Sequence, residues 1–182
     1  MFPIPLPDTW YSAKEMLTQV QDPIAADWIK CESSLTVRIK ELGIAFNVDV
    51  LNQCQRNLTQ VQRGLVDTQD ESGLFREVLL KQGELPLVYA QTIMPDSTVS
   101  GTESMLSKLG NQSLGQVLFQ SPQATRGEIE YSEVKADTEL GQFIEKTLKQ
   151  PIEQTCYIRR SLFLLNNKPL LVCECFLPAL FL

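Results

Sequence analysis

The spacing of apolar side chains changes character along the chain. In the first third, apolar residues recur at the three- and four-residue intervals of a buried helix face, behind residues that favour helix starts. Three helices are predicted there: one capped by Asp8 that runs through Leu17, one opened by Asp22-Pro23, and one that begins at Ser33 or Ser34 and ends before Gly43.

Extended segments dominate the rest of the chain. From Ile44 the apolar period becomes two, which is typical of a half-buried strand. Two pairs of extended segments predict hairpins, 74–81 with 85–94 and 155–165 with 170–177. A further strand is expected at 125–135, and helices at 100–110 (from a capping box between Ser100 and Glu103), 114–119 and 137–150.

Hairpin-linked strands with helices before and between them predict an α+β fold, an antiparallel β-sheet with helices packed on it. The chain shows no internal repeat, long linker or low-complexity tract. Its 182 residues, 43% of them hydrophobic, suffice for one sizeable core. We therefore expect residues 1–182 to form a single domain.

Composition and charge exclude several functions. The chain has no histidine, which rules out Ser-His-Asp and Cys-His nucleophiles and histidine-containing metal sites. Its net charge is −6, whereas a nucleic-acid or anionic-membrane partner calls for a basic surface. We expect no nucleic-acid partner, no membrane insertion and no metal, and any anionic ligand needs a local basic site.

The cysteines and the first residues bear on the compartment. The five cysteines are odd in number and show no C-x-x-C spacing, which argues against disulfides and structural zinc: Cys31, Cys54, Cys156, Cys173 and Cys175. The opening ten residues lack the positive and apolar regions of a signal peptide. We expect a cytoplasmic protein that acts as a monomer.

Glu174 is a charged residue in an otherwise apolar strand. It shares one face with Val172 and Phe176, and the other face looks buried too. A carboxylate in such a place needs a partner or a shifted pKa. It is either a structural residue, paired or reaching water at the strand end, or a ligand-binding group.

Arg76 poses the same question, because it shares its strand face with Val78 and Leu80. A guanidinium there can receive a planar carboxylate through two hydrogen bonds, or it can form a cross-strand ion pair, with Glu174 as one partner. Of Arg159 and Arg160, at most one points inward. The turn at Ser113-Leu114-Gly115 can expose backbone N–H groups to an anion, and Lys108 and Lys135 are expected in solvent.

Four blocks of sequence follow one another: Leu74-Phe-Arg-Glu-Val-Leu-Leu80, Ala90-Gln-Thr-Ile-Met-Pro95, Leu109-Gly-Asn-Gln-Ser-Leu-Gly-Gln-Val-Leu-Phe119 and Lys168-Pro-Leu-Leu-Val-Cys-Glu-Cys-Phe-Leu-Pro178. In this order and spacing they resemble the chorismate lyase (chorismate–pyruvate lyase) family. The resemblance covers most of the chain from about Leu35 to Pro178.

The resemblance implies a sheet that encloses a buried ligand site, and conversion of chorismate to 4-hydroxybenzoate and pyruvate without metal or organic cofactor, early in ubiquinone-type quinone synthesis. By their places in the blocks, Arg76 and the Leu114 N–H resemble the groups that hold the ring carboxylate. Glu174 resembles the carboxylate at the 4-hydroxyl end, and Leu35 falls where the family often has a methionine that lines the pocket.

Two features keep other interpretations open. Gln91 stands where relatives commonly carry an arginine, so a second basic contact is either missing or supplied by Arg160. The fold also resembles the effector-sensing domains of some bacterial regulators, which makes a non-catalytic small-molecule effector-binding domain the alternative. Such domains are normally fused to a winged helix, and we expect none in the short acidic stretch before Ile44.

Overall fold

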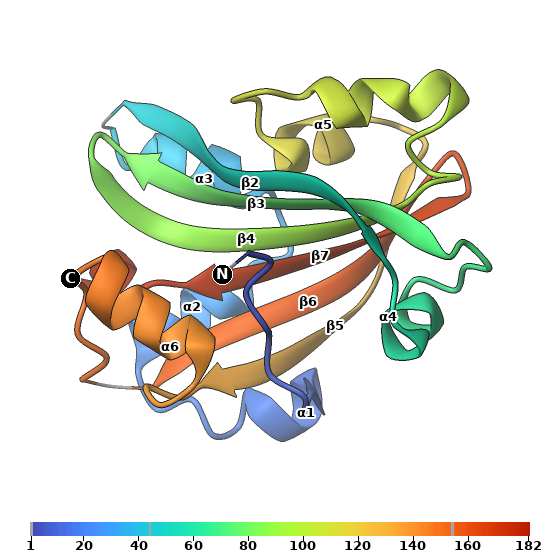
Figure 1. Cartoon of the computed structure of the whole chain (residues 1–182). Helices are drawn as coiled ribbons and strands as arrows, with labels where there is room; N and C mark the ends of the chain where they lie inside the picture. Colours follow the sequence, from blue (N-terminus) through green and yellow to red (C-terminus); the bar gives the residue numbers. More distant parts are fainter. Residues whose placement is uncertain (1, 44, 154) are drawn as a thin grey trace.

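A computed structural model describes residues 2–43, 45–153 and 155–182. In this part of the chain, seven strands form one antiparallel sheet in the order β1-β5-β6-β7-β4-β3-β2 (Figure 1). The strands are β1 (Tyr11–Ser12), β2 (Phe46–Asn57), β3 (Ser72–Gln82), β4 (Leu85–Pro95), β5 (Ala124–Val134), β6 (Cys156–Leu165) and β7 (Lys168–Phe176). The predicted α+β fold class is confirmed.

Helices cover both faces of the sheet. In Figure 1, α6 and the N-terminal segment lie in front of it, whereas α2 and α3 lie behind it. None of the helices in the described ranges has the length and apolar composition that crossing a bilayer requires. The helical elements are α1 (Ala13–Met16), α2 (Pro23–Ile29), α3 (Leu35–Glu41), α4 (Gln60–Leu65), α5 (Leu114–Gln120), α6 (Glu139–Gln142), the 3₁₀ helices η1 (Gly101–Lys108) and η3 (Pro178–Phe181), and the π-helical η2 (Phe143–Thr147).

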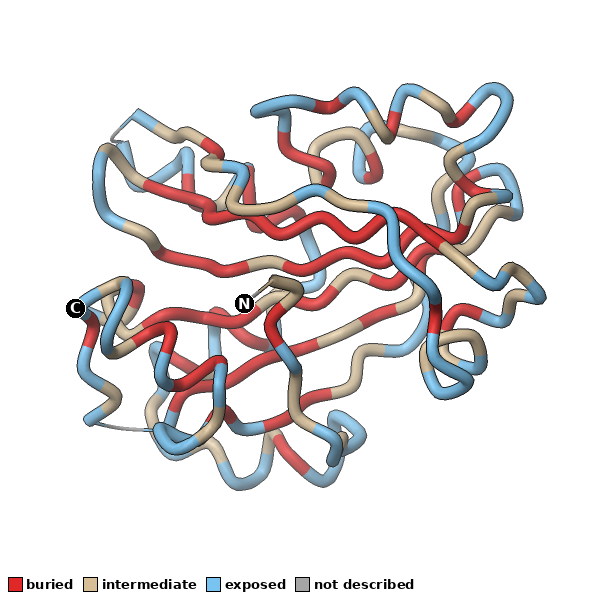
Figure 2. The backbone as a smooth tube through the Cα atoms, viewed as in Figure 1, coloured by how far each residue is buried: buried red, intermediate tan, exposed pale blue. Residues whose placement is uncertain are grey.

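Strand β7 is buried on both sides, as its sequence predicts. Leu171, Cys173 and Cys175 face a core that includes Ile144 from η2, whereas Phe176 on the other face packs with residues of α2 and α3. Figure 2 shows the central strands buried over most of their length, with exposed positions at the rims. A polar side chain on either face of these strands must therefore find a partner inside the protein.

Both predicted hairpins are confirmed, β3 with β4 and β6 with β7. The second turns through Asn166 and Asn167, whose φ angles are 51° and 62°. Two successive positive φ angles match the twist of adjoining strands, and asparagine tolerates them better than most residues. The turn fixes the register that sets Arg159 opposite Glu174.

The first helix differs from the prediction. Asp8 does not cap it. Instead Ser12 caps α1 through a reciprocal capping box with Glu15, and Trp10 stays outside the helix. Residues Tyr11–Ser12 pair with β5, and this pairing leaves only the later cap available. Ile44, where the change to a period of two was predicted, lies outside the described residues.

The helix predicted at 100–110 forms as the 3₁₀ helix η1, but its capping box is absent. Ser100 Oγ donates to the carbonyl of Ser97 at 2.8 Å, and the Glu103 side chain turns inward. There it meets Lys168 Nζ at 2.6 Å and accepts a hydrogen bond of 2.7 Å from Asn166. Hydrogen bonds from Lys168, Thr102 and Asn166 hold the pKa of Glu103 at about 2.

Glu103→Gln should therefore destabilise the protein in a pH-dependent way. A carboxyl whose folded pKa lies near 2 and whose ordinary pKa is 4.5 stabilises the folded state above pH 4.5 and loses this contribution as the pH falls toward 2. We expect the melting temperature of the variant to lie below that of the wild type at pH 7 and to approach it near pH 2.5. An equal difference at both pH values would contradict the assignment.

Candidate active site

A small cavity lies on the sheet face that α3 and α5 cover. Side chains of β3, β4, β5 and β7 line it on one side, and residues at the starts of α3 and α5 line it on the other. The four residues predicted as site residues, Leu35, Arg76, Leu114 and Glu174, all border this cavity. The structure thus brings together side chains that lie up to 139 positions apart in the sequence, counted from Leu35 to Glu174.

Serine caps place Leu35 and Leu114 at the cavity. Ser34 caps α3 and Ser113 caps α5, so that each leucine is the first residue of its helix. The first N–H groups of a helix have no acceptor within the helix, which leaves the Leu114 N–H available to a ligand. The Thr36 and Ser113 hydroxyls share a hydrogen bond, and Lys40 Nζ donates to Gln116 at 3.2 Å. These two bonds join α3 to α5 beside the cavity.

Arg76 is a buried cation whose partners are all neutral. It is 2% exposed and donates to Gln53 Oε1 at 3.0 Å and to the carbonyls of Gly110 and Gln112 at 2.7 and 3.3 Å. Within the described ranges it forms no ion pair, so the proposed cross-strand pair with Glu174 is wrong. Burial lowers the pKa of Arg76. A desolvated guanidinium without a counter-charge favours binding of an anionic ligand.

Arg76 is on β3 and Glu174 on β7, the strands on either side of β4, and both side chains lie on the same face of the sheet. Glu174 has cationic partners of its own. Arg159 Nε donates to Glu174 Oε2 at 2.8 Å, and Arg126 Nη2 lies 3.7 Å from the same oxygen. The ion-pair interpretation of Glu174 is therefore confirmed, although the carboxylate also borders the cavity. Arg159 is 1% exposed and donates to the backbone carbonyls of Ile29 and Cys31 as well.

Arg126 is a cavity residue that the sequence analysis missed. Its Nε donates to Ser161 Oγ at 2.8 Å and its Nη1 to the Glu32 carbonyl at 3.1 Å. Burial first, and then the neighbouring charge of Arg159, lower the pKa of Arg126. A register shift between Arg126 and Ile129 puts these two residues on one face of β5, although simple alternation would separate them. Because of this bulge, the alternation of apolar and polar residues along β5 does not show that Arg126 faces the cavity.

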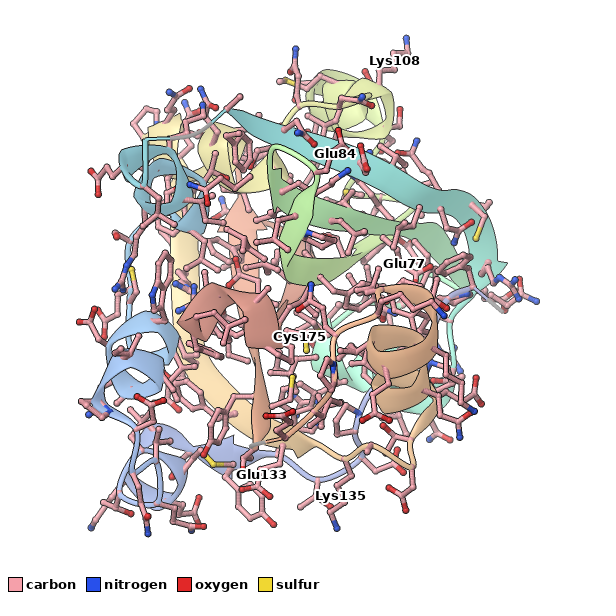
Figure 3. All side chains as sticks on the ribbon, turned by 90° about the vertical axis from the view of Figure 1, so that its left-hand side faces the viewer. Glu77, Glu84, Lys108, Glu133, Lys135 and Cys175 are labelled. Atoms are coloured by element: carbon pink, nitrogen blue, oxygen red, sulfur yellow. The ribbon has the colours of Figure 1, made fainter. Side chains whose placement is uncertain are left out.

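Gln91 and Arg160 face away from the cavity. Gln91 Nε2 donates to the Ile4 carbonyl at 2.8 Å, beside the buried carboxylate of Glu77, which Figure 3 shows on the α6 side of the sheet. Arg160 Nε donates to Glu130 at 2.7 Å, and its guanidinium lies 4.3 Å from the centre of the Trp10 ring. The proposal that Arg160 supplies a second basic contact is therefore wrong, and Arg126 and Arg159 provide the additional cations.

The other chemical candidates stay outside the site. Lys108 and Lys135 are exposed, as predicted, and Figure 3 shows them at opposite ends of the molecule. All five cysteines are free thiols. Cys173 and Cys175 flank Glu174 but face the opposite side of the sheet, where burial raises the pKa of Cys173 to about 12. Neither thiol is poised to act as a nucleophile.

Solved structures define the class to which this fold belongs. PhnF from Mycobacterium smegmatis matches with a TM-score of 0.61 at 10% identity, over 84% of this chain and 67% of that chain. The effector domain of PhnF alone matches with a TM-score of 0.54 at 9% identity, over 81% and 90%. At such identities the likeness shows the fold alone, which is the α+β fold of effector-binding domains.

Sequence comparison identifies the family. The family model "Chorismate lyase" matches residues 5–182. A probable chorismate pyruvate-lyase from Pseudoalteromonas translucida is 36% identical over 100% of this chain and 98% of the relative, and a chorismate pyruvate-lyase from Salmonella schwarzengrund is 32% identical over 87% and 85%. The chain therefore belongs to the chorismate lyase family, as the four sequence blocks predicted, and this is a family of enzymes.

The two buried arginines should respond in opposite ways to the same substitution. Arg159→Met leaves the Glu174 carboxylate and two backbone carbonyls without their donor, so we expect a loss of about 3 kcal/mol in the free energy of unfolding. Arg76→Met removes a buried charge that has no counter-charge, and its acceptors belong to exposed residues that water can reach. We expect its melting temperature to be the same as that of the wild type or up to about 4 °C higher.

Thermal and urea unfolding of the two variants, measured side by side at pH 7, checks both expectations. A loss of stability in Arg76→Met as large as that in Arg159→Met would show that Arg76 is a structural residue. An unchanged Arg159→Met would show that the Glu174 ion pair contributes little to stability.

Proposed function

We propose that this protein converts chorismate to 4-hydroxybenzoate and pyruvate. The observation that carries the proposal is the pairing, in one cavity of a chorismate lyase family member, of a buried arginine that lacks a counter-charge with a carboxylate two strands away. Arg76 is aligned through Thr92 with Val172, two positions from Glu174. With adjacent strands about 4.8 Å apart and residues about 3.4 Å apart along a strand, the backbones at Arg76 and Glu174 are separated by roughly 12 Å. A six-membered ring with polar groups at opposite ends suits this arrangement.

The reaction suits a site without histidine. Chorismate loses enolpyruvate and the hydrogen at C4, and the ring becomes aromatic, so the reaction is strongly downhill. The protein has to bind the substrate in a reactive conformation, stabilise the negative charge that develops on the leaving group, and exclude water. Buried arginines and a covered cavity meet these demands without a nucleophile.

Each of the four predicted residues has a role in the proposed complex. Arg76 and the Leu114 N–H hold the ring carboxylate, because they are the donors at one end of the cavity. Glu174 orients the 4-hydroxyl and assists proton movement at the other end. Leu35 packs against the ring, because it is an apolar residue at the start of α3 that borders the cavity.

The proposal extends to the setting of the enzyme. We propose that residues 1–182 act as one domain, because the strands of a single sheet carry Arg76, Arg126 and Glu174, and that the protein acts as a monomer. Five free thiols suit the reducing cytoplasm, and the net charge of −6 disfavours nucleic-acid partners. 4-Hydroxybenzoate would enter ubiquinone-type quinone synthesis, and the reaction would need no cofactor.

A non-catalytic effector-binding function is the second candidate, and the fold shared with the PhnF effector domain favours it. Turnover distinguishes the two. Purified protein incubated with chorismate in the presence of a chelator should release pyruvate and 4-hydroxybenzoate in equal amounts. Binding of chorismate without either product would favour effector sensing, and pyruvate with a different aromatic product would indicate another chorismate-processing activity.

Arg76→Ala should lower kcat/KM for chorismate by about 100-fold or more. Loss of a charge-assisted contact in a desolvated site costs about 3 kcal/mol, and about 1.4 kcal/mol corresponds to a factor of ten. Steady-state kinetics with pyruvate detection checks this value, and Lys108→Ala, which removes an exposed cation outside the cavity, serves as the control. Wild-type kcat/KM in Arg76→Ala would refute the assignment of Arg76.

Glu174→Gln tests proton movement separately from shape, because it removes the charge at nearly constant size. We expect a fall in kcat of at least tenfold with a smaller change in the affinity for 4-hydroxybenzoate. If kcat stays at the wild-type value, Glu174 only positions the substrate.

A further inference from the structure

We propose that Arg126 binds the second carboxylate of chorismate, the one on the enolpyruvyl group. This inference rests on the proposed function and adds to it a residue that distinguishes the substrate from the aromatic product. It follows from the hydrogen bonds and ion pairs of the two arginines that line the cavity, Arg76 and Arg126, and of the neighbouring Arg159, and from the positions of the two carboxylates on chorismate.

Arg159 and Arg126 differ in how many hydrogen bonds they already make within the protein. Arg159 is 1% exposed, and its Nε and Nη1 already donate to Glu174 and to two backbone carbonyls. Within the part of the chain that the structure describes, Arg126 donates hydrogen bonds only through Nε, to Ser161 Oγ, and through Nη1, to the Glu32 carbonyl. Its Nη2 lies 3.7 Å from Glu174 Oε2, which is beyond normal hydrogen-bond distance. Arg126 can therefore accept an anionic ligand without giving up its present partners.

The charges in the cavity match a ligand with two carboxylates. Arg159 at 2.8 Å and Arg126 at 3.7 Å share the single carboxylate of Glu174, and Arg76 has no counter-charge among the described residues, so three guanidinium groups face one carboxylate and two positive charges stay unbalanced. Arg76 and Arg126 border the same cavity, in a chain whose net charge is −6. Two unbalanced cations in a desolvated site favour a dianion over a monoanion.

The positions of the two carboxylates on chorismate agree with the positions of these arginines. The ring carboxylate is on C1, opposite the 4-hydroxyl, whereas the enolpyruvyl ether is on C3, next to the hydroxyl-bearing carbon. With the ring carboxylate at Arg76 and the 4-hydroxyl at Glu174, the enolpyruvyl group lies at the Glu174 end. Arg126 is the cation at that end whose side chain lines the cavity, and its Nη2 is not used in a hydrogen bond within normal distance to any residue in the described ranges.

The reaction gives Arg126 a role in bond cleavage. The C3–O bond breaks and its electron pair moves to the ether oxygen, while C4 loses its hydrogen as a proton. The electron pair of the C4–H bond forms the C3–C4 double bond that completes the aromatic ring. Enolpyruvate leaves and takes up a proton to become pyruvate. A guanidinium at the enolpyruvyl carboxylate holds the leaving group as this negative charge develops.

Because 4-hydroxybenzoate lacks the enolpyruvyl carboxylate, Arg126 should matter for the substrate and not for this product. The test compares Arg126→Gln and Arg126→Lys with the wild type. Arg160→Gln serves as the matched control, since Arg160 lies on β6, the strand next to the β5 strand of Arg126, but points to the other face of the sheet. Isothermal titration calorimetry gives the dissociation constant of 4-hydroxybenzoate, and steady-state kinetics gives kcat and KM for chorismate.

We expect Arg126→Gln to lower kcat/KM at least 100-fold, with KM raised, while the dissociation constant of 4-hydroxybenzoate changes less than threefold. Arg126→Lys, which keeps the charge, should recover at least a tenth of the wild-type kcat/KM, and it also serves if the glutamine variant fails to fold. Arg160→Gln should match the wild type in both measurements. Equal losses for chorismate and 4-hydroxybenzoate in Arg126→Gln would overturn the proposal, as would unchanged kcat/KM.

The test also separates this inference from the proposed function. If the wild-type protein binds chorismate but releases no pyruvate, the lyase function fails, and calorimetric titration with chorismate replaces kinetics. Weaker chorismate binding in Arg126→Gln with unchanged 4-hydroxybenzoate binding would then still support the carboxylate site. Equal binding of chorismate by the variant and the wild type would refute it.

Discussion

The ion pair between Arg159 and Glu174 is the interaction on which the site depends. The two residues lie opposite one another on β6 and β7, near the middle of the sheet. The same guanidinium donates to the carbonyls of Ile29, the last residue of α2, and Cys31, two residues later. One side chain thus fixes the orientation of a cavity carboxylate and ties a covering helix to the sheet. Desolvating this pair is costly, and the hydrogen bonds of Arg159 to Glu174 and to two backbone carbonyls offset part of the cost.

Strand periodicity explains how much of the site the sequence could predict. Regular β7 keeps a strict period of two, so its alternation correctly placed Glu174 on the face opposite Cys173 and Cys175. The same reasoning limited Arg159 and Arg160 to one inward residue, but it could not say which of them that is. Arg126 was not predicted as a cavity residue, because the register shift before Ile129 reverses the alternation of faces in β5. A bulge is a tertiary feature with no period of its own.

Helix starts were predictable only where tertiary contacts do not compete with the local cap. Asp22 and Ser34 cap α2 and α3 as their sequences indicate. Glu103 instead gives up a local cap for Lys168 and Asn166, which lie more than 60 positions later. A buried carboxylate gains more from a nearby ammonium group than from one exposed backbone N–H group. Such a choice depends on which segments the fold brings together, and local sequence does not contain that information.

The contrast between an acidic protein and a basic cavity follows from the range of electrostatic forces. Salt screens charges on the surface beyond about 8 Å at physiological ionic strength, so a net charge of −6 has little effect on an anion that is already between α3 and α5. Inside the cavity the nearest charges dominate, and there Arg76 and Arg126 outnumber the single carboxylate of Glu174. The acidic exterior therefore does not weaken anion binding. It disfavours large polyanions such as nucleic acids, which must approach the surface as a whole, and leaves a small dicarboxylate free to enter.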